Sequence, residues 1–179
     1  AHMMKGSSLP EYEKGYLDGL SGGALREAWA LLVDETADAY AALDPSSRVP
    51  WAGPSMSARS AISARQMETW AHGQEIFDVL GTDREEHDRI RNIVVLGINT
   101  FGWTFKVRGE TPPDPMPFVS LVSPSGEVWT YGESQQSNFI QGDAVEFAQV
   151  VTQTRNIGDT GLTVVGDPAS DWMSKAQCF

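Results

Sequence analysis

The sequence predicts an α+β protein in which a helical bundle is followed by a small α/β domain. Up to Gly109, apolar residues recur at the three- and four-residue spacing of amphipathic helices. Beyond a proline-rich stretch at 111–117, the pattern changes to short strand-like runs. We therefore expect three parts, namely a tag remnant with an irregular arm at 1–20, a helical bundle domain at 21–109 and a small α/β domain at 110–179.

Three helices are expected in the bundle domain. The first covers 24–43 and stops at an Asp-Pro pair. A loop with two prolines around Trp51 leads to the second helix, which ends at Gly81 in the usual glycine position. The third should begin at once, because 82–85 reads as a capping box, and extend to about Phe105.

The small domain is expected to contain a β-hairpin and two helices. The strands fall at 118–122 and 127–131, separated by the turn residues 124–126. A short strand and the two helices complete the domain, at 138–141, 142–155 and 168–177.

Composition and charge narrow the class of partner. The formal net charge is −11 in 179 residues, which argues against nucleic acid and against anionic membrane surfaces. No apolar run approaches the roughly 20 residues of a membrane span, and no signal peptide is recognisable. The single cysteine, Cys178, cannot form an internal disulfide, as is typical of a reducing cytoplasm. We expect a cytoplasmic protein that acts on a small molecule.

The second predicted helix carries a row of ionisable residues on one face. This polar lane consists of Arg65, Glu68, His72 and Glu75. Large apolar residues border the lane on both sides, whereas a solvated charged face is not normally bordered in this way. We therefore expect the lane to face into the bundle.

Glu68 and His72 stand four residues apart, so both side chains project from the same face of the helix. A carboxylate and an imidazole at this spacing can share one divalent metal, or they can form an ordinary ion pair. A zinc site needs a third protein ligand. His2 belongs to the apparent tag remnant, and the acidic and basic neighbours of His87 indicate a solvated face.

At these positions the chain resembles a known family. The segments that carry the resemblance are Val49-Pro50-Trp51-Ala52-Gly53-Pro54-Ser55-Met56-Ser57-Ala58 and Ala64-Arg65-Gln66-Met67-Glu68-Thr69-Trp70-Ala71-His72-Gly73-Gln74. They are similar to the DinB-like superfamily of mycothiol-dependent maleylpyruvate isomerases, and more narrowly to its actinobacterial metal-binding branch. The similarity continues through 88–91, 96–97, 124–132 and 171–177, and covers most of the chain from about Ala24.

The resemblance implies a bundle that holds one divalent metal through two histidines and one glutamate. Glu68 and His72 match two of these ligands. The remaining histidine belongs to an earlier helix, so either the protein lacks that helix or further residues belong with the sequence given. Asn92 and Val95 also stand where the family branch has imidazoles. We expect substoichiometric metal unless a dimer partner or an additional segment supplies a ligand.

Three functions remain open for the polar lane. In the first, Glu68 and His72 bind zinc, which holds the thiolate of a low-molecular-weight thiol for isomerisation or transfer, as the resemblance implies. In the second, they form a metal-free acid/base pair beside Arg65 in an isomerase, cyclase or lyase of specialised metabolism. In the third, the lane belongs to a non-catalytic binding protein. Glu75, Trp51 and Trp70 are the candidate substrate-binding residues.

The family's first helix has no counterpart in the chain, so the bundle has about three helices instead of four. The apolar stripe that the missing helix would cover is then left open, and large open apolar patches usually mark an interface. We therefore predict a homodimer.

Overall fold

The computed structural model describes residues 11, 14–15, 17, 19–51 and 55–178. The chain forms two compact units, Ala1–Ile62 and Ser63–Phe179. Most of the predicted arm at 1–20 lies outside the described residues, as do the three residues that follow Trp51. None of the described helices is both long enough and apolar enough to cross a bilayer.

The first unit contains helix α2, Gly22–Ala41, and a small hairpin of β1, Arg48–Val49, with β2, Met56–Ser57. The predicted first helix is confirmed within two residues at each end. It stops before a turn in which the Asp44 carboxylate accepts hydrogen bonds from the backbone N–H and hydroxyl of Ser46. None of the residues of α2 is buried.

Helix α3, Ala58–Leu80, begins in the first unit and continues into the second. It ends at Gly81, whose φ of 62° places it in the left-handed region that glycine adopts freely, as predicted. In the second unit, the buried residues of α3 recur at helical spacing and are Ala64, Met67, Trp70, Ala71 and Gln74.

The third predicted helix begins later than expected, and the prediction of a start at Thr82 is wrong. Residues 82–87 contain no helix, and a 3-10 turn, η1 at Asp88–Ile90, precedes helices α4, Arg91–Asn99, and α5, Phe101–Lys106. Burial alternates from residue to residue over 83–88, as in an extended chain. This conformation brings Arg84 and Glu86 onto Trp70 of α3. The contacts of Arg84 and Glu86 with Trp70 stabilise the extended conformation more than the capping box would stabilise a helix start at Thr82.

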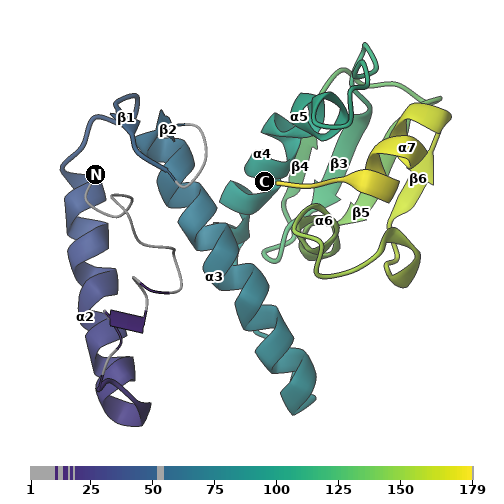
Figure 1. Ribbon diagram of the computed structural model, residues 1–179. Coiled ribbons are helices and arrows are strands. Elements are labelled where there is room, and N and C mark those ends of the chain that lie inside the picture. The colour runs from purple at the N-terminus through teal and green to yellow at the C-terminus, as the bar shows by residue number, and fades with distance from the viewer. Residues whose placement is uncertain (1–10, 12–13, 16, 18, 52–54, 179) are drawn as a thin grey trace. The chain divides into compact units, whose positions relative to one another are not determined.

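The sheet of the second unit has four strands in the order β4-β3-β5-β6 (Figure 1). The predicted hairpin is confirmed as β3, Phe118–Val122, antiparallel to β4, Val128–Tyr131. Strand β5, Phe139–Asp143, runs parallel to β3. Strand β6, Thr163–Val165, pairs antiparallel with β5 and was not predicted, because a three-residue run is too short to show an alternating pattern.

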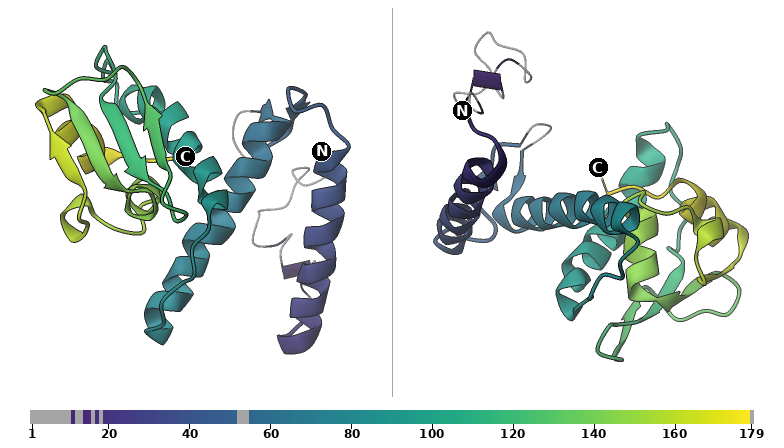
Figure 2. Two further views of the ribbon diagram at one scale, coloured as in Figure 1. Left: turned by 180° about the vertical axis from the view of Figure 1, so that it is seen from behind. Right: turned by 90° about the horizontal axis from the view of Figure 1, so that it is seen from below.

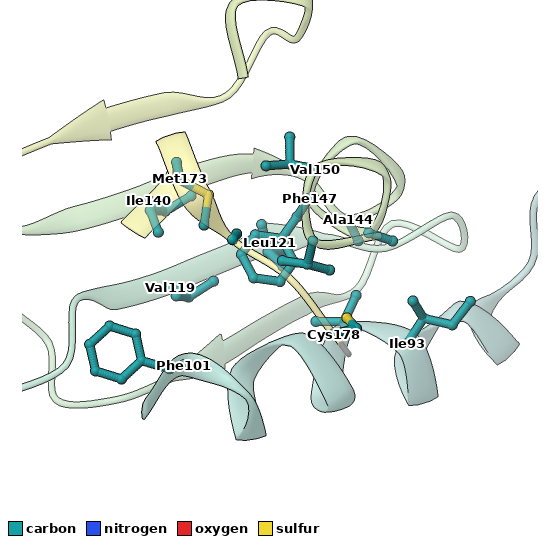
Figure 3. Packing of buried hydrophobic residues seen from close by; sticks show 14 of the residues in the cluster. Ile93, Phe101, Val119, Leu121, Ile140, Ala144, Phe147, Val150, Met173 and Cys178 are labelled. Carbon is teal, nitrogen blue, oxygen red and sulfur yellow. The ribbon is translucent and has the colours of Figure 1, made fainter. Parts of the chain in front are cut away.

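Helices α6, Ala144–Val151, and α7, Asp167–Lys175, match the two predicted helices of the small domain with shorter bounds. They join α4 and α5 in one apolar core against the sheet, as Figure 3 shows for Ile93, Phe101, Leu121 and Phe147. The apolar faces of α4 and α5 are buried in the same core as the strands. The division between the two compact units falls between Ile62 and Ser63, and the predicted domain boundary after Gly109 stays a prediction.

Two segments that carried the family resemblance contact each other in the second unit. The Asp88 carboxylate accepts hydrogen bonds from the Ser125 backbone N–H at 3.0 Å and the Ser125 hydroxyl at 2.6 Å. The Arg91 guanidinium lies 5.2 Å from the centre of the Trp129 ring. These contacts hold the start of α4 against the β3–β4 hairpin, so both segments have a structural role.

Candidate functional site: the polar lane of helix α3

The polar lane lies on the exposed face of α3 in the second unit. The side chains of Glu68, His72 and Glu75 are 43%, 73% and 71% exposed, and Arg65 is exposed as well. The opposite stripe, which includes Met67 and Trp70, is buried instead. The expectation that the lane faces into a core is therefore wrong for this unit. The apolar borders of the lane misled the prediction, because Ile76 and Leu80 are themselves exposed.

His72 lies between two carboxylates. Its Nε2 atom is 3.4 Å from Glu68 Oε2, and its Nδ1 atom is 3.7 Å from Glu75 Oε1. A neutral imidazole carries one N–H, whereas an imidazolium can donate from both nitrogens. Each ring nitrogen therefore has one carboxylate nearby, and an imidazole in this position can accept or donate a proton.

The two ring nitrogens point to different carboxylates, and this geometry bears on metal binding. A metal coordinated by His72 would occupy the lone pair of one nitrogen, so only one of the two glutamates could share it. Among the residues that the structure describes, no group of three or more His, Cys, Asp or Glu side chains is placed to hold a metal ion. The lane by itself does not fit a zinc site, and a third ligand would have to come from elsewhere.

In the block Trp70-Ala71-His72-Gly73, three residues serve the packing of the helix and one side chain is exposed. Trp70 and Ala71 are buried. A Cβ atom added at Gly73 would lie 3.6 Å from a terminal nitrogen of Arg84, so the small residue leaves room for this guanidinium beside the helix. His72 alone projects into solvent.

Trp70 is held by a network on the buried side of α3. Its indole N–H donates to the Glu86 carboxylate at 3.0 Å, and its backbone carbonyl accepts from Arg84 Nη1 at 2.7 Å. Arg84 Nε lies 3.3 Å from Glu86 Oε1. Burial lowers the pKa of the Arg84 guanidinium, and the charge of Glu86 acts in the opposite direction. This packing leaves the Trp70 indole little surface for the substrate contact expected of it.

The other predicted site residues lie away from the lane or have other partners. Trp51 is half-buried in the first unit, beside residues that the structure does not describe. His87 is exposed and lies 3.8 Å from Glu85, which confirms the expected solvated face. The Asn92 side chain, at a position where the family branch has an imidazole, donates to Gln66 Oε1 at 2.9 Å. It therefore ties α4 to α3.

Cys178 feels the charge of one residue of the lane, a link that the sequence did not indicate. Burial raises the pKa of its thiol to about 12; a hydrogen bond with Thr100 acts against this, and the negative charge of Glu68 adds to it. Figure 3 shows Cys178 within the apolar core. A thiol with so high a pKa is not a nucleophile at neutral pH. No spacing signal in the sequence links Cys178 to Glu68, since the two residues are far apart along the chain.

Part of the chain matches a known family. Residues 16–77, which contain the whole polar lane, match the mycothiol maleylpyruvate isomerase N-terminal domain. This match confirms the resemblance inferred from the sequence, and it is carried by residues 16–77. No solved structure matches the chain.

The chain is also similar to two uncharacterized proteins of Mycobacterium tuberculosis, from strains CDC 1551 and H37Rv. Each is 36% identical over 163 residues, a match that covers 91% of this chain and 63% of the relative. The chain thus spans less than two thirds of the length of these relatives.

Proposed function

We propose that the protein is a small-molecule isomerase or thiol transferase whose active site is the polar lane of α3. One observation carries the proposal: within the Trp-Ala-His-Gly block of the matched segment, the fold uses Trp70, Ala71 and Gly73 for packing and leaves His72 exposed between two carboxylates. An exposed imidazole flanked by acids has no packing role there. It is suited to proton transfer.

Each residue of the polar lane has a separate role that follows from the chemistry of its side chain. Arg65 binds a carboxylate or enolate oxygen of the substrate, because its guanidinium offers paired donors. His72 takes the proton of a low-molecular-weight thiol as the thiolate adds to the conjugated double bond, and the substrate becomes an enolate. Rotation about the former double bond and loss of the thiolate give the isomer, and His72 returns the proton to sulfur. Glu68 and Glu75 hold the ring in position between them.

The thiol is the co-substrate that the family resemblance implies, and the proton transfers proposed for His72 need no metal. In the family's chemistry a bound zinc would lower the pKa of the thiol. In this chain Glu68 and His72 could supply two ligands of the zinc ion, and the polar lane, whose residues the structure describes, offers no third ligand placed to join them.

A second function is favoured by the contacts of both ring nitrogens with carboxylates. In this alternative the His72, Glu68 and Glu75 cluster acts as a metal-independent acid/base centre in an isomerase, cyclase or lyase, without a thiol. The imidazolium donates a proton to one atom of the substrate while a carboxylate removes a proton from another. Dependence of the rate on a thiol distinguishes the two functions.

The test is a turnover assay on the purified chain. Conversion of maleylpyruvate is followed by ultraviolet absorbance with and without mycothiol, in the presence of added zinc or of a chelator. We expect His72→Ala to lower kcat/KM by about a hundredfold or more, the usual range for loss of a general acid or base. Arg65→Gln should raise KM.

Arg59→Gln serves as the matched control, since Arg59 is an exposed arginine of the same helix outside the lane. Circular dichroism should show that each variant keeps its fold. Equal activity of His72→Ala and Arg59→Gln would contradict the proposal. Ligand binding without turnover in any condition would instead indicate a non-catalytic binding protein.

A further inference from the structure

Among the described helices of the second unit, none lies over one face of the sheet of that unit. Val119, Leu121 and Ile140 point toward the helices and are completely buried. Phe118, Ser120, Phe139 and Gln141 alternate with them and therefore point to the other side. The left view of Figure 2 shows the strands facing the viewer with no helix in front of them.

This uncovered face is hollowed at its centre. The hollow has a volume of about 220 Å³ and is lined by Phe118, Ser120, Gln135, Gln136, Phe139 and Gln141. Phe118 pairs in register with Phe139, and Ser120 pairs with Gln141, on the neighbouring parallel strands β3 and β5. The wall comes from the loop after β4, where Gln135 Nε2 donates to the Met116 carbonyl oxygen at 3.2 Å. This hydrogen bond fixes the loop at the edge of the sheet.

The lining has a distinctive chemistry. It contains no charged residue, although the chain has a formal net charge of −11. Two phenyl rings supply an apolar surface, while three carboxamides and a hydroxyl supply donors and acceptors. Phenyl rings stack with planar ring systems, and glutamine carboxamides can bind the donor and acceptor edge of such a ring in a bidentate manner.

We propose that this hollow is a binding site for an uncharged planar heteroaromatic ring of the size of a nucleobase. The ring stacks on Phe118 and Phe139, and the carboxamides of Gln135 and Gln141 bind its polar edge. The volume suits one small ring system and is below that typical of drug-sized ligands. The absence of cations from the lining and the net charge disfavour a nucleic-acid strand, whose phosphates need Lys or Arg. This site is separate from the polar lane and does not depend on its function.

The experiment is a titration of the purified chain with adenosine, followed by amide chemical shifts in two-dimensional NMR. We expect saturable shifts confined to 118–120, 135–136 and 139–141, with none from ribose alone. Adenosine monophosphate should bind more weakly, because the site offers no cation to its phosphate. Gln141→Ala and Phe139→Ala should each raise the Kd at least fivefold.

Thr130→Ala is the matched control, because Thr130 is an exposed residue of the paired strand β4 and does not line the hollow. It should leave the Kd unchanged. Gln141 is exposed, so its variant tests the site without risk to the core if Phe139→Ala fails to fold. No saturable shift, equal shifts with ribose, or equal effects of Gln141→Ala and Thr130→Ala would overturn the proposal. Concentration-dependent shifts of the same residues without ligand would also overturn it, since a second copy of the chain would then cover the face.

Discussion

Replacing Glu86 by alanine should destabilise the fold through its contacts with α3. The Glu86 carboxylate accepts the indole N–H of Trp70 and lies 3.3 Å from Arg84 Nε. The side chains of Arg84 and Glu86 are only 17% and 15% exposed. The substitution leaves a buried indole N–H without its acceptor and a largely buried guanidinium without its counter-ion.

The size of the effect follows from these two losses. An orphaned buried donor costs about 1–3 kcal/mol. Removing one partner of a fully buried ion pair costs about 3–5 kcal/mol, and the remaining exposure of this pair reduces that figure. Arg84 also keeps its bond to the Trp70 carbonyl. We therefore expect a loss of about 2–4 kcal/mol in the free energy of unfolding, or a fall in Tm of about 5–15 °C for a chain of this length.

The assay is urea unfolding followed by tryptophan fluorescence, with Glu85→Ala as the control. Glu85 is the adjacent acid, and its side chain is 87% exposed. Its variant should change the free energy by less than about 0.5 kcal/mol, as is usual for surface positions. If the two variants lose the same stability, the network around Trp70 does not stabilise the fold and the reasoning is refuted.

Three further predictions concern packing, pH and assembly. Gly97→Ala should lower the free energy of unfolding by about 1–3 kcal/mol through overpacking, because the added methyl would lie 2.8 Å from Val151 Cγ2. Val151→Ala should then destabilise this variant less than it destabilises the parent protein. Equal effects of Val151→Ala in the two backgrounds would contradict the clash. The hydrogen bonds from Arg155 and then from Gln74 lower the pKa of Asp78, so its contribution to stability is complete above the unfolded value of 3.8 and is lost as pH falls through the lower folded value. Asp78→Asn should therefore flatten the acid limb of the stability curve, and an unchanged limb would exclude this role. Finally, we propose that a second copy of the chain covers the exposed Leu25 and Trp29 of α2, so that sedimentation at micromolar concentration gives a homodimer; a stable monomer would disprove it.

Strong local signals made much of the fold predictable from sequence. The first two helices, the hairpin and the terminal helix each have periodic apolar residues bounded by Gly, Pro or Asp, and the structure confirms them. The start of the third helix was not predictable, because residues 82–87 satisfy a local capping pattern and are nevertheless held extended by Arg84 and Glu86. Only the contact with Trp70, far away along the chain, decides between these conformations.

In the candidate site, too, features set by local sequence were predictable, whereas features set by contacts between distant segments were not. Helical spacing alone predicts that Glu68, His72 and Glu75 share one face, and the distances within the lane agree. Spacing does not reveal which face of α3 is buried, because apolar residues occur on both sides of the lane. The burial of Trp70 depends on α3 packing against a segment that follows it. The influence of the Glu68 charge on Cys178 depends likewise on the path of the chain terminus.

The two sides of α3 therefore allow stability and function to be measured separately. Glu86→Ala weakens the contacts that hold the helix and leaves the groups of the polar lane in place, so activity per folded molecule should be retained below the new Tm. His72→Ala removes a side chain that is 73% exposed, so stability should change little while turnover falls. If His72→Ala costs several kcal/mol and turnover is retained, the lane is a structural network. The opposite pattern is the one expected of a site that the fold carries on its surface without needing it for stability.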